Sequence, residues 1–224
     1  MTYDITLITC TGNRPKAFKL CEHYVGRQKT GLNIQWIVVN DGNADIESDL
    51  ITDLIISKKK RKQGVNSLGS NMLLSLDKIQ SDNVLFFEDD DWYSPQYVQY
   101  YYNKLQKHDL FGQGCAKYYN LKYKNYHVHK NMQHASLCQT GIKTELLLRN
   151  KNIFNSNDPF YDIELWRLDV DKYIEFKSDL CIGIKGLHDG LGIGHKNNST
   201  WQNDHNNVKL KEFIGNDYGL YAQK

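Results

Sequence analysis

The chain of 224 residues is long enough for one α/β domain and too short for two domains of ordinary size. Hydrophobic residues make up 40% and charged residues 24%, which excludes an intrinsically disordered chain, and the formal net charge of +2 excludes a protein whose whole surface binds polyanions. Five scattered cysteines without Cys-x-x-Cys spacing indicate reduced thiols in a cytoplasm, and without an apolar run of about 18 residues we expect no membrane span.

Strands and helices alternate along residues 1–107. Short apolar runs predict strands, and apolar side chains at three- and four-residue spacing predict helices. The predicted strands are 5–10, 34–39, 54–57 and 84–87, and the predicted helices are 15–26, 67–79 and 96–107. This β-α-β-β-α-β-α order favours a Rossmann-like α/β domain, with a mostly parallel central sheet flanked by helices.

The second half of the chain carries weaker patterns. Residues 111–150 are rich in Tyr, Lys, Asn and His, which indicates short strands and loops, and 146–148 and 163–168 are predicted to be helical. Five glycines within 183–194 predict a mobile or tightly turned loop, suited to act as a lid over a ligand. No repeat or linker divides the sequence, so we expect a single domain over 1–224.

Four acids follow the apolar run at 84–87 directly. Glu88, Asp89, Asp90 and Asp91 would lie at the carboxyl end of a strand, where open α/β sheets bind ligands. Adjacent carboxylates repel one another, so a divalent cation such as Mn²⁺ or Mg²⁺ would relieve the repulsion. On the same reasoning, replacing Asp90 with alanine should leave the free protein folded and slightly more stable. The alternative is a solvated acidic turn that caps the helix near Pro95.

The first two predicted strands also end in polar side chains. The first leads into Thr9-Cys10-Thr11-Gly12-Asn13-Arg14 and the second into Asn40-Asp41-Gly42. Parallel strands end at one edge of a sheet, so these residues should lie beside the acids. A nucleoside diphosphate fits that set, with Asp41 accepting a hydrogen bond from a base N–H, although Asn-Asp-Gly is also a common turn.

Four motifs in this order resemble the family 2 glycosyltransferases with the GT-A fold. They are Ile-Thr-Leu-Ile-Thr-Cys-Thr-Gly-Asn-Arg-Pro at 5–15, Val-Asn-Asp-Gly at 39–42, Glu-Asp-Asp-Asp-Trp-Tyr-Ser-Pro at 88–95, and Tyr-Asp-Ile-Glu-Leu-Trp-Arg at 161–167. The sequence departs from the family pattern at Glu88, where Asp is usual. It also lacks the usual arginine near position 70, which leaves Arg14 or the basic run at 58–62 to supply that charge.

The resemblance implies a metal-dependent, inverting transfer of a sugar from a nucleotide sugar, most readily a UDP-sugar, to an acceptor hydroxyl. It implies Asp162 as general base, with Glu164 as a second catalytic residue; the alternative for Asp162 is a helix N-terminal charge. The implied metal ligands are Asp90, Asp91 and His195, although His188 is another candidate and most surface histidines bind nothing. The implied nucleotide-sugar-binding residues are Thr9, Thr11, Asn13, Arg14, Asp41, Asn71, Glu88, Asp89 and Trp166.

The same resemblance divides the chain into a nucleotide-sugar-binding half at 1–107 and an acceptor-binding half at 108–224 with a C-terminal loop. Two acceptors stay open: a saccharide of a cell envelope, free or lipid-linked, and a 5-hydroxymethyl pyrimidine in phage DNA, which would place the protein in the host cytoplasm. The basic run at 58–62 and the Tyr- and Lys-rich stretch at 117–130 suit DNA phosphates and an extruded base, but sugars also stack on tyrosines.

The sequence disfavours two other classes of function. A sugar-nucleotide nucleotidyltransferase shares the sheet and the metal, but it needs a more glycine-rich loop after the first strand than Thr11–Pro15 provides. A non-catalytic carbohydrate-binding module would have no use for four consecutive acids.

Overall fold

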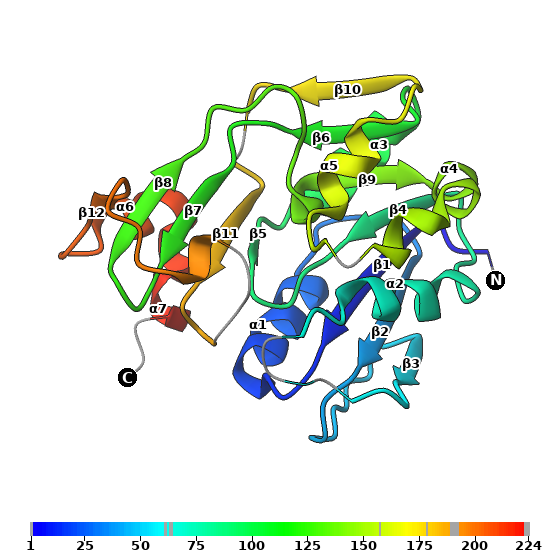
Figure 1. Ribbon diagram of the computed structural model, residues 1–224, viewed down its shortest axis with the longest axis horizontal. Coiled ribbons are helices and arrows are strands. Elements are labelled where there is room, and N and C mark those ends of the chain that lie inside the picture. The colour runs from blue at the N-terminus through cyan, green and yellow to red at the C-terminus, as the bar shows by residue number, and fades with distance from the viewer. Residues whose placement is uncertain are drawn as a thin grey trace.

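A seven-stranded sheet forms the centre of the computed structural model, which describes residues 2–60, 62, 65–156, 158–177, 179–188 and 193–221 (Figure 1). Its strand order is β10-β6-β9-β4-β1-β2-β3. The strands are β1 (Ile5–Thr11), β2 (Ile34–Asn40), β3 (Asp53–Ile56), β4 (Asn83–Phe86), β6 (Leu110–Gln113), β9 (Thr140–Lys143) and β10 (Lys172–Glu175). Among these strands only β9 runs against the others, so the mostly parallel sheet predicted from the sequence is confirmed.

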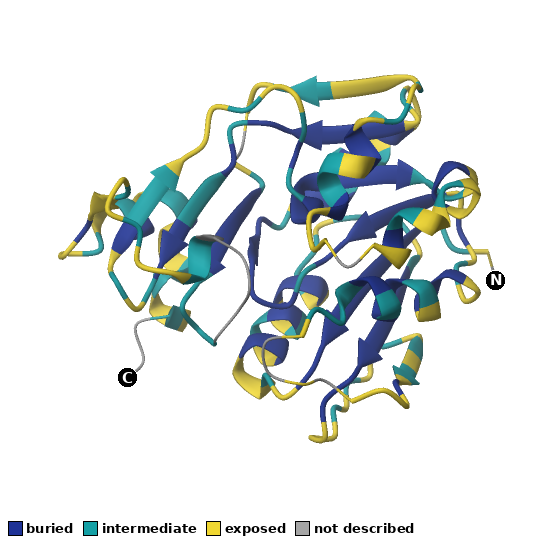
Figure 2. Cartoon of the chain, in the orientation of Figure 1, coloured by how far each residue is buried: buried dark blue, intermediate teal, exposed yellow. Residues whose placement is uncertain are grey.

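Helices cover both faces of this sheet. On one face lie α1 (Pro15–Gly26) and α3 (Tyr97–Leu105), and on the other lie α2 (Leu68–Leu76), α4 (Thr144–Arg149), η2 (Lys151–Asn155) and α5 (Tyr161–Trp166). Successive side chains of a strand point to opposite faces of the sheet. Leu7 therefore packs in the core under α1 and α3, and Ile8 packs in the core on the opposite face. Figure 2 shows the central strands in the colour of buried residues. Burial on both faces explains why the strands read as unbroken apolar runs.

A second sheet of five strands lies beside the first, in the order β12-β8-β7-β11-β5. It contains β5 (Trp92–Tyr93), β7 (Lys117–Asn120), β8 (Asn125–Val128), β11 (Cys181–Lys185) and β12 (Gln202–Asn203). The remaining elements are η1 (Leu137–Gln139), η3 (Ile193–His195), α6 (Val208–Ile214), η4 (Gly215–Asp217) and α7 (Tyr218–Tyr221). The second half of the chain supplies strands to both sheets, and β5 carries the first half into the second sheet.

The glycine-rich segment at 183–194 differs from its prediction as one loop. Gly183 lies inside β11. Glycine is needed there because a Cβ would lie 2.4 Å from the ring of Tyr118. The turn starts only at Gly186, whose φ of +89° suits glycine. Gly190 and Gly192 lie outside the described residues, so the lid stays a prediction. None of the described helices combines the length and apolar character that crossing a membrane needs.

Candidate functional site

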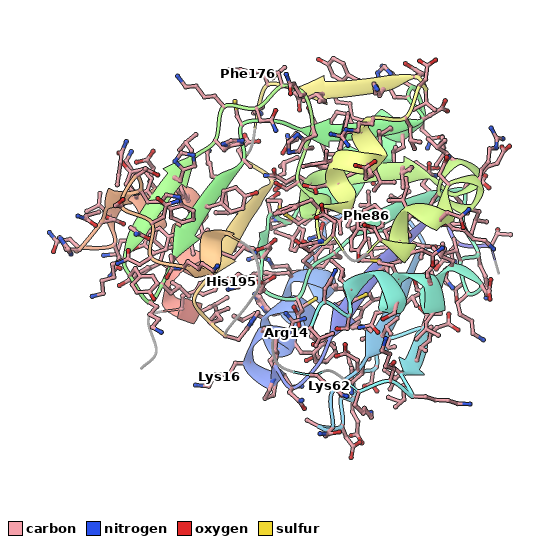
Figure 3. The ribbon with its side chains drawn as sticks, in the orientation of Figure 1. Arg14, Lys16, Lys62, Phe86, Phe176 and His195 are labelled. Carbon is pink, nitrogen blue, oxygen red and sulfur yellow. The ribbon has the colours of Figure 1, made fainter. Side chains whose placement is uncertain are left out.

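A cavity of about 670 Å³ opens at the carboxyl ends of β1, β2 and β4. Its other walls come from the second sheet, from η1 and from the start of α5. Ten of the residues singled out in the sequence line it together: Thr11, Arg14, Asp41, Asn71, Glu88, Asp89, Asp90, Asp91, Asp162 and His195. Figure 3 shows two of them, Arg14 just before α1 and His195 in η3. The cavity is therefore lined by segments from both halves of the chain.

Four other predicted site residues do not line the cavity and have partners elsewhere. Thr9 is buried inside β1, where its Oγ1 donates to Phe87 O at 2.7 Å. Asn13 is exposed, and its Oδ1 accepts the Asn43 N–H at 2.8 Å. Two side chains of α5 share this outcome, Glu164 and Trp166.

The geometry of α5 accounts for these last two. Glu164 is two residues beyond Asp162, which places it about 200° around the helix, and there it forms an exposed ion pair with Arg167. Trp166 is 3% exposed and donates its indole N–H to Thr140 Oγ1 at 3.0 Å. The expectation that both would border the ligand site is therefore corrected, because one faces solvent and the other packs in the core.

Asp41 is fixed at the end of β2 by a short set of contacts. Its Oδ2 accepts a hydrogen bond from Asn71 Nδ2 of α2 at 2.8 Å, and its side chain is almost fully buried. A Cβ on Gly12 would lie 2.0 Å from Asp41 Oδ1, so only glycine fits the neighbouring β1 end. The site therefore holds one buried carboxylate, oriented by an amide, on the β2 side of the cavity.

The acid cluster after β4 is matched by cations from distant parts of the chain. Asp89 accepts from Thr11 Oγ1 at 2.6 Å and pairs with Arg14 at 3.0 Å. Lys185 Nζ, at the end of β11, lies 2.9 Å from Asp91 Oδ1 and 3.3 Å from Asp90 Oδ2. Two partly buried cations therefore offset the mutual repulsion that the sequence predicted for the free cluster.

Burial and these partners set the charge states in opposite directions. Burial raises the pKa of Glu88, Asp89 and Asp91. Burial also works against the charge of Asp90, but Lys185, a hydrogen bond from His188 and Arg14 together hold the pKa of Asp90 well below its usual range. The carboxylates in turn outweigh burial at Lys185 and raise the pKa of its ammonium well above the ordinary value.

A divalent cation fits the donor atoms that surround Asp90. Ligand atoms of Glu88, Asp90 and Asp91 lie within 4.8 Å of one another, as do those of Asp89, Asp90 and His188. His195 Nε2 is 3.7 Å from Asp90 Oδ2, and burial followed by the charge of Lys185 lowers the pKa of His195 to about 4, so its ring is neutral at pH 7. Asp91 Oδ2, although buried, has no hydrogen-bond donor among the described residues. Carboxylate oxygens and a neutral imidazole are both metal ligands, so these residues could hold a divalent cation.

Asp162 lies in the first turn of α5 and lines the same cavity as the acid cluster. Burial raises its pKa, and the nearby His134 partly opposes that rise. His134 also lines the cavity and is held by Asn131. A carboxylate with a raised pKa is a stronger base than an ordinary aspartate, which suits proton abstraction from a hydroxyl group.

From the sequence we singled out the stretch 117–130, which contains Tyr118 and His127, but missed Trp201 and Lys185 as lining residues of the cavity. Tyr118 and His127 of the β7–β8 pair lie against Trp201, whose ring stacks on His127 with centroids 5.8 Å apart and an interplanar angle of 16°. Lys185 follows the apolar residues 181–184, and that run was the available signal for a strand. The glycines around it led to the prediction of a loop.

Comparisons with known proteins come from sequence and from structure. The model of the family described as glycosyl transferase family 2 matches residues 6–164. No curated protein sequence matches the chain. Residues 1–349 of S. aureus TarS match the structure with a TM-score of 0.62 and 13% identity, covering 81% of this chain and 60% of that one.

Two further structures of the same S. aureus protein contain ligands. The complex of TarS 1–349 with UDP gives a TM-score of 0.60 at 14% identity, covering 81% of this chain and 60% of that chain. The complex with UDP-GlcNAc gives 0.58 at 13% identity, with 86% and 60% covered. The chain thus spans less than two thirds of these structures, and at such identity the likeness shows a shared fold.

Proposed function

We propose a donor, a mechanism and an acceptor for this chain, which belongs to glycosyl transferase family 2 and is therefore a glycosyltransferase. The donor is a nucleotide sugar, and the UDP and UDP-GlcNAc complexes of the S. aureus protein with the same fold support a UDP-sugar. The observation that carries the proposal is the cavity itself, where the ends of β1, β2 and β4 meet Asp162. The strand ends provide a place for a diphosphate, and Asp162 provides a base; glycosyl transfer needs both.

The residues take separate roles in this mechanism. Asp41, held by Asn71, accepts a hydrogen bond from the base N–H, and Arg14 and Lys185 face the diphosphate. Asp90, Asp91 and His195 would hold Mn²⁺ or Mg²⁺, with His188 beside them, and such a cation neutralises charge on the leaving diphosphate.

Asp162 takes the proton from the acceptor hydroxyl as its oxygen attacks the anomeric carbon. The new C–O bond forms on the face opposite the leaving UDP, and the electron pair of the broken bond stays on the diphosphate. A single displacement of this kind inverts the anomeric configuration. Family membership argues against both the nucleotidyltransferase and the non-catalytic binding module.

For the acceptor we favour a 5-hydroxymethyl pyrimidine in DNA. The basic run at 58–62 leaves the carboxyl end of β3, which is the cavity edge of the sheet, and Tyr118, His127 and Trp201 offer flat rings to an extruded base. Arg61 lies outside the described residues. A saccharide is the second candidate. Arg14 and Lys185 are the only arginine and lysine among the described residues that line the cavity, and both already pair with acids, so neither is available to an acceptor phosphate.

Binding and transfer assays test the proposal together. We expect UDP to raise the thermal unfolding midpoint more with Mn²⁺ than with EDTA, since a ligand that binds only the folded state stabilises it. UDP-sugars should then be offered with hydroxymethylated DNA and with saccharide acceptors, and products identified by mass spectrometry. Absence of both UDP binding and sugar transfer would refute the proposed donor.

A further inference from the structure

Lys185 is placed on the same oxygens that the proposed metal requires. Its Nζ contacts Asp91 Oδ1 at 2.9 Å and Asp90 Oδ2 at 3.3 Å, and only 12% of its side chain is exposed. These two aspartates belong to one set of ligand atoms within 4.8 Å. An ammonium and a divalent cation repel each other at such distances, so Lys185 and the metal cannot both bind these carboxylate oxygens tightly at the same time.

The surroundings of Lys185 permit its ammonium to move away from the two aspartates. Its ammonium is a compact charge on a flexible four-carbon stem. It stands at the last residue of β11, directly before the turn at Gly186, and it lines the open cavity. Arg14 lacks this freedom, because its guanidinium is tied to both Asp89 and the Cys10 carbonyl at 3.0 Å.

We propose that Lys185 exchanges partners when the donor binds: its ammonium leaves Asp90 and Asp91 for the oxygens of the diphosphate, and this vacates the aspartate oxygens for the metal. The inference rests on the proposed function and adds a role for a residue outside the family motifs. The free protein then binds the divalent cation weakly, because Lys185 competes with it. A bound diphosphate removes the competitor, so metal and nucleotide bind cooperatively.

Calorimetric titration of Lys185→Gln tests the exchange without any turnover. Coupling between two binding events in proteins typically amounts to about 5–150-fold in affinity. We expect Lys185→Gln to bind Mn²⁺ without nucleotide roughly tenfold more tightly than the wild type, and to bind UDP in EDTA roughly tenfold more weakly. The gain in Mn²⁺ affinity caused by UDP should shrink correspondingly. Lys107→Gln removes the same charge from an exposed position outside the cavity and should bind Mn²⁺ and UDP like the wild type.

Two further measurements keep the test decisive if Lys185→Gln folds poorly. Lys185→Arg keeps the charge, so it should bind Mn²⁺ alone as weakly as the wild type. In the wild type, the ¹⁵N signal of the Lys185 ammonium should shift on addition of UDP in EDTA, when no metal is present to displace it. Unchanged or weaker Mn²⁺ binding by folded Lys185→Gln, or an ammonium signal that UDP leaves in place, would overturn the exchange. Failure of the wild type to bind Mn²⁺ with or without UDP would instead overturn the metal proposal beneath it.

Discussion

Asp90 illustrates how partners from other elements change what one carboxylate does. Lys185, His188 and His195 all approach its Oδ2. Lys185, His188 and Arg14 hold its pKa below the ordinary value in spite of burial. A carboxyl group whose pKa is lower in the folded state stabilises the fold at every pH above its unfolded pKa. That stabilisation declines as the pH falls below the unfolded pKa and is gone once the pH has passed through the folded value.

We therefore expect Asp90→Asn to lower the free energy of unfolding at pH 7 by about 1–3 kcal/mol, the usual cost of removing one partner from a buried charged contact. The deficit should stay constant between pH 7 and about pH 5 and narrow below the ordinary aspartate pKa. Urea denaturation of the metal-free protein measures it, with exposed Asp45→Asn as the control. A more stable Asp90→Asn protein at pH 7 would restore the view that repulsion dominates this cluster.

Asp162 offers a residue-scale test of the chemistry. Loss of a general base typically costs about 10²–10⁴-fold in rate, so Asp162→Asn should lose transfer by that factor while keeping its affinity for UDP. The base must be ionised to work, and burial raises its pKa, so the wild-type rate should fall at acid pH with a midpoint above the ordinary aspartate value. Asp169→Asn removes an exposed charge outside the cavity and serves as the control. Equal loss of UDP binding and transfer would assign Asp162 to the donor site instead.

The residues of the cavity divide into those that topology predicts and those that it does not. Thr11, Asp41 and Asp90 follow parallel strands, and the rule that such strands end at one edge was enough to bring them together. Lys185 reaches the same cluster from a strand of the other sheet, 94 residues beyond Asp91. No local pattern encodes that approach.

The elements show the same division. The apolar runs at β1, β2 and β4 predicted these strands to within one residue at each end, because strands buried on both faces are marked by apolar content alone. β5 has two residues and depends on pairing with β11, so it left no periodic signal. In β11 itself, Gly183 is required by the ring of Tyr118, a contact between segments that sequence reading treats as unrelated.

Gly69 provides an element-scale prediction, because it lets α2 approach η2 and α5 closely. A Cβ at this position would lie 2.3 Å from the Phe154 carbonyl oxygen and 2.5 Å from the Tyr161 hydroxyl, which Asn66 also contacts. Backbone cannot yield cheaply, so Gly69→Ala should cost about 1–3 kcal/mol by overpacking, in spite of the better helix propensity of alanine.

The same displacement of α2 would draw Asn71 away from Asp41 and weaken UDP binding. Urea denaturation and calorimetry measure the two effects. Gly219→Ala, where nothing lies within 4 Å of the added Cβ, controls for the substitution itself. Unaltered stability of Gly69→Ala would show that the helices can separate without cost.

At the scale of the whole molecule, the two sheets place different charges around one cavity. The central sheet contributes the acid cluster and, past the end of β3, the exposed lysines of the basic run at 58–62. The second sheet contributes rings, and two of its lysines lie over aromatic side chains: Lys117 Nζ is 5.5 Å from the Phe213 ring and Lys122 Nζ is 5.6 Å from the Tyr123 ring. A polyanionic acceptor would therefore contact the basic run more than the β7–β8 pair.

This arrangement gives the last prediction, on DNA binding. Each lysine that neutralises a phosphate adds roughly 0.7–0.9 to the slope of log affinity against log salt. Replacing Lys58, Lys59 and Lys62 by glutamine should therefore weaken DNA binding and reduce that slope by about 2–3 if each contacts a phosphate. Lys60 is left intact because it donates to the Gly42 carbonyl at 2.7 Å.

The matched control replaces Lys78, Lys107 and Lys151, which follow the C-terminal ends of α2, α3 and α4 at the opposite edge of the sheet. Fluorescence anisotropy with hydroxymethylated duplex and single-stranded DNA over a salt series measures both triple variants. Equal slopes for the two variants, or transfer to a saccharide in the absence of any transfer to hydroxymethylated DNA, would make the saccharide the acceptor. UDP binding should be unchanged in both variants, because none of the six lysines lines the cavity among the described residues.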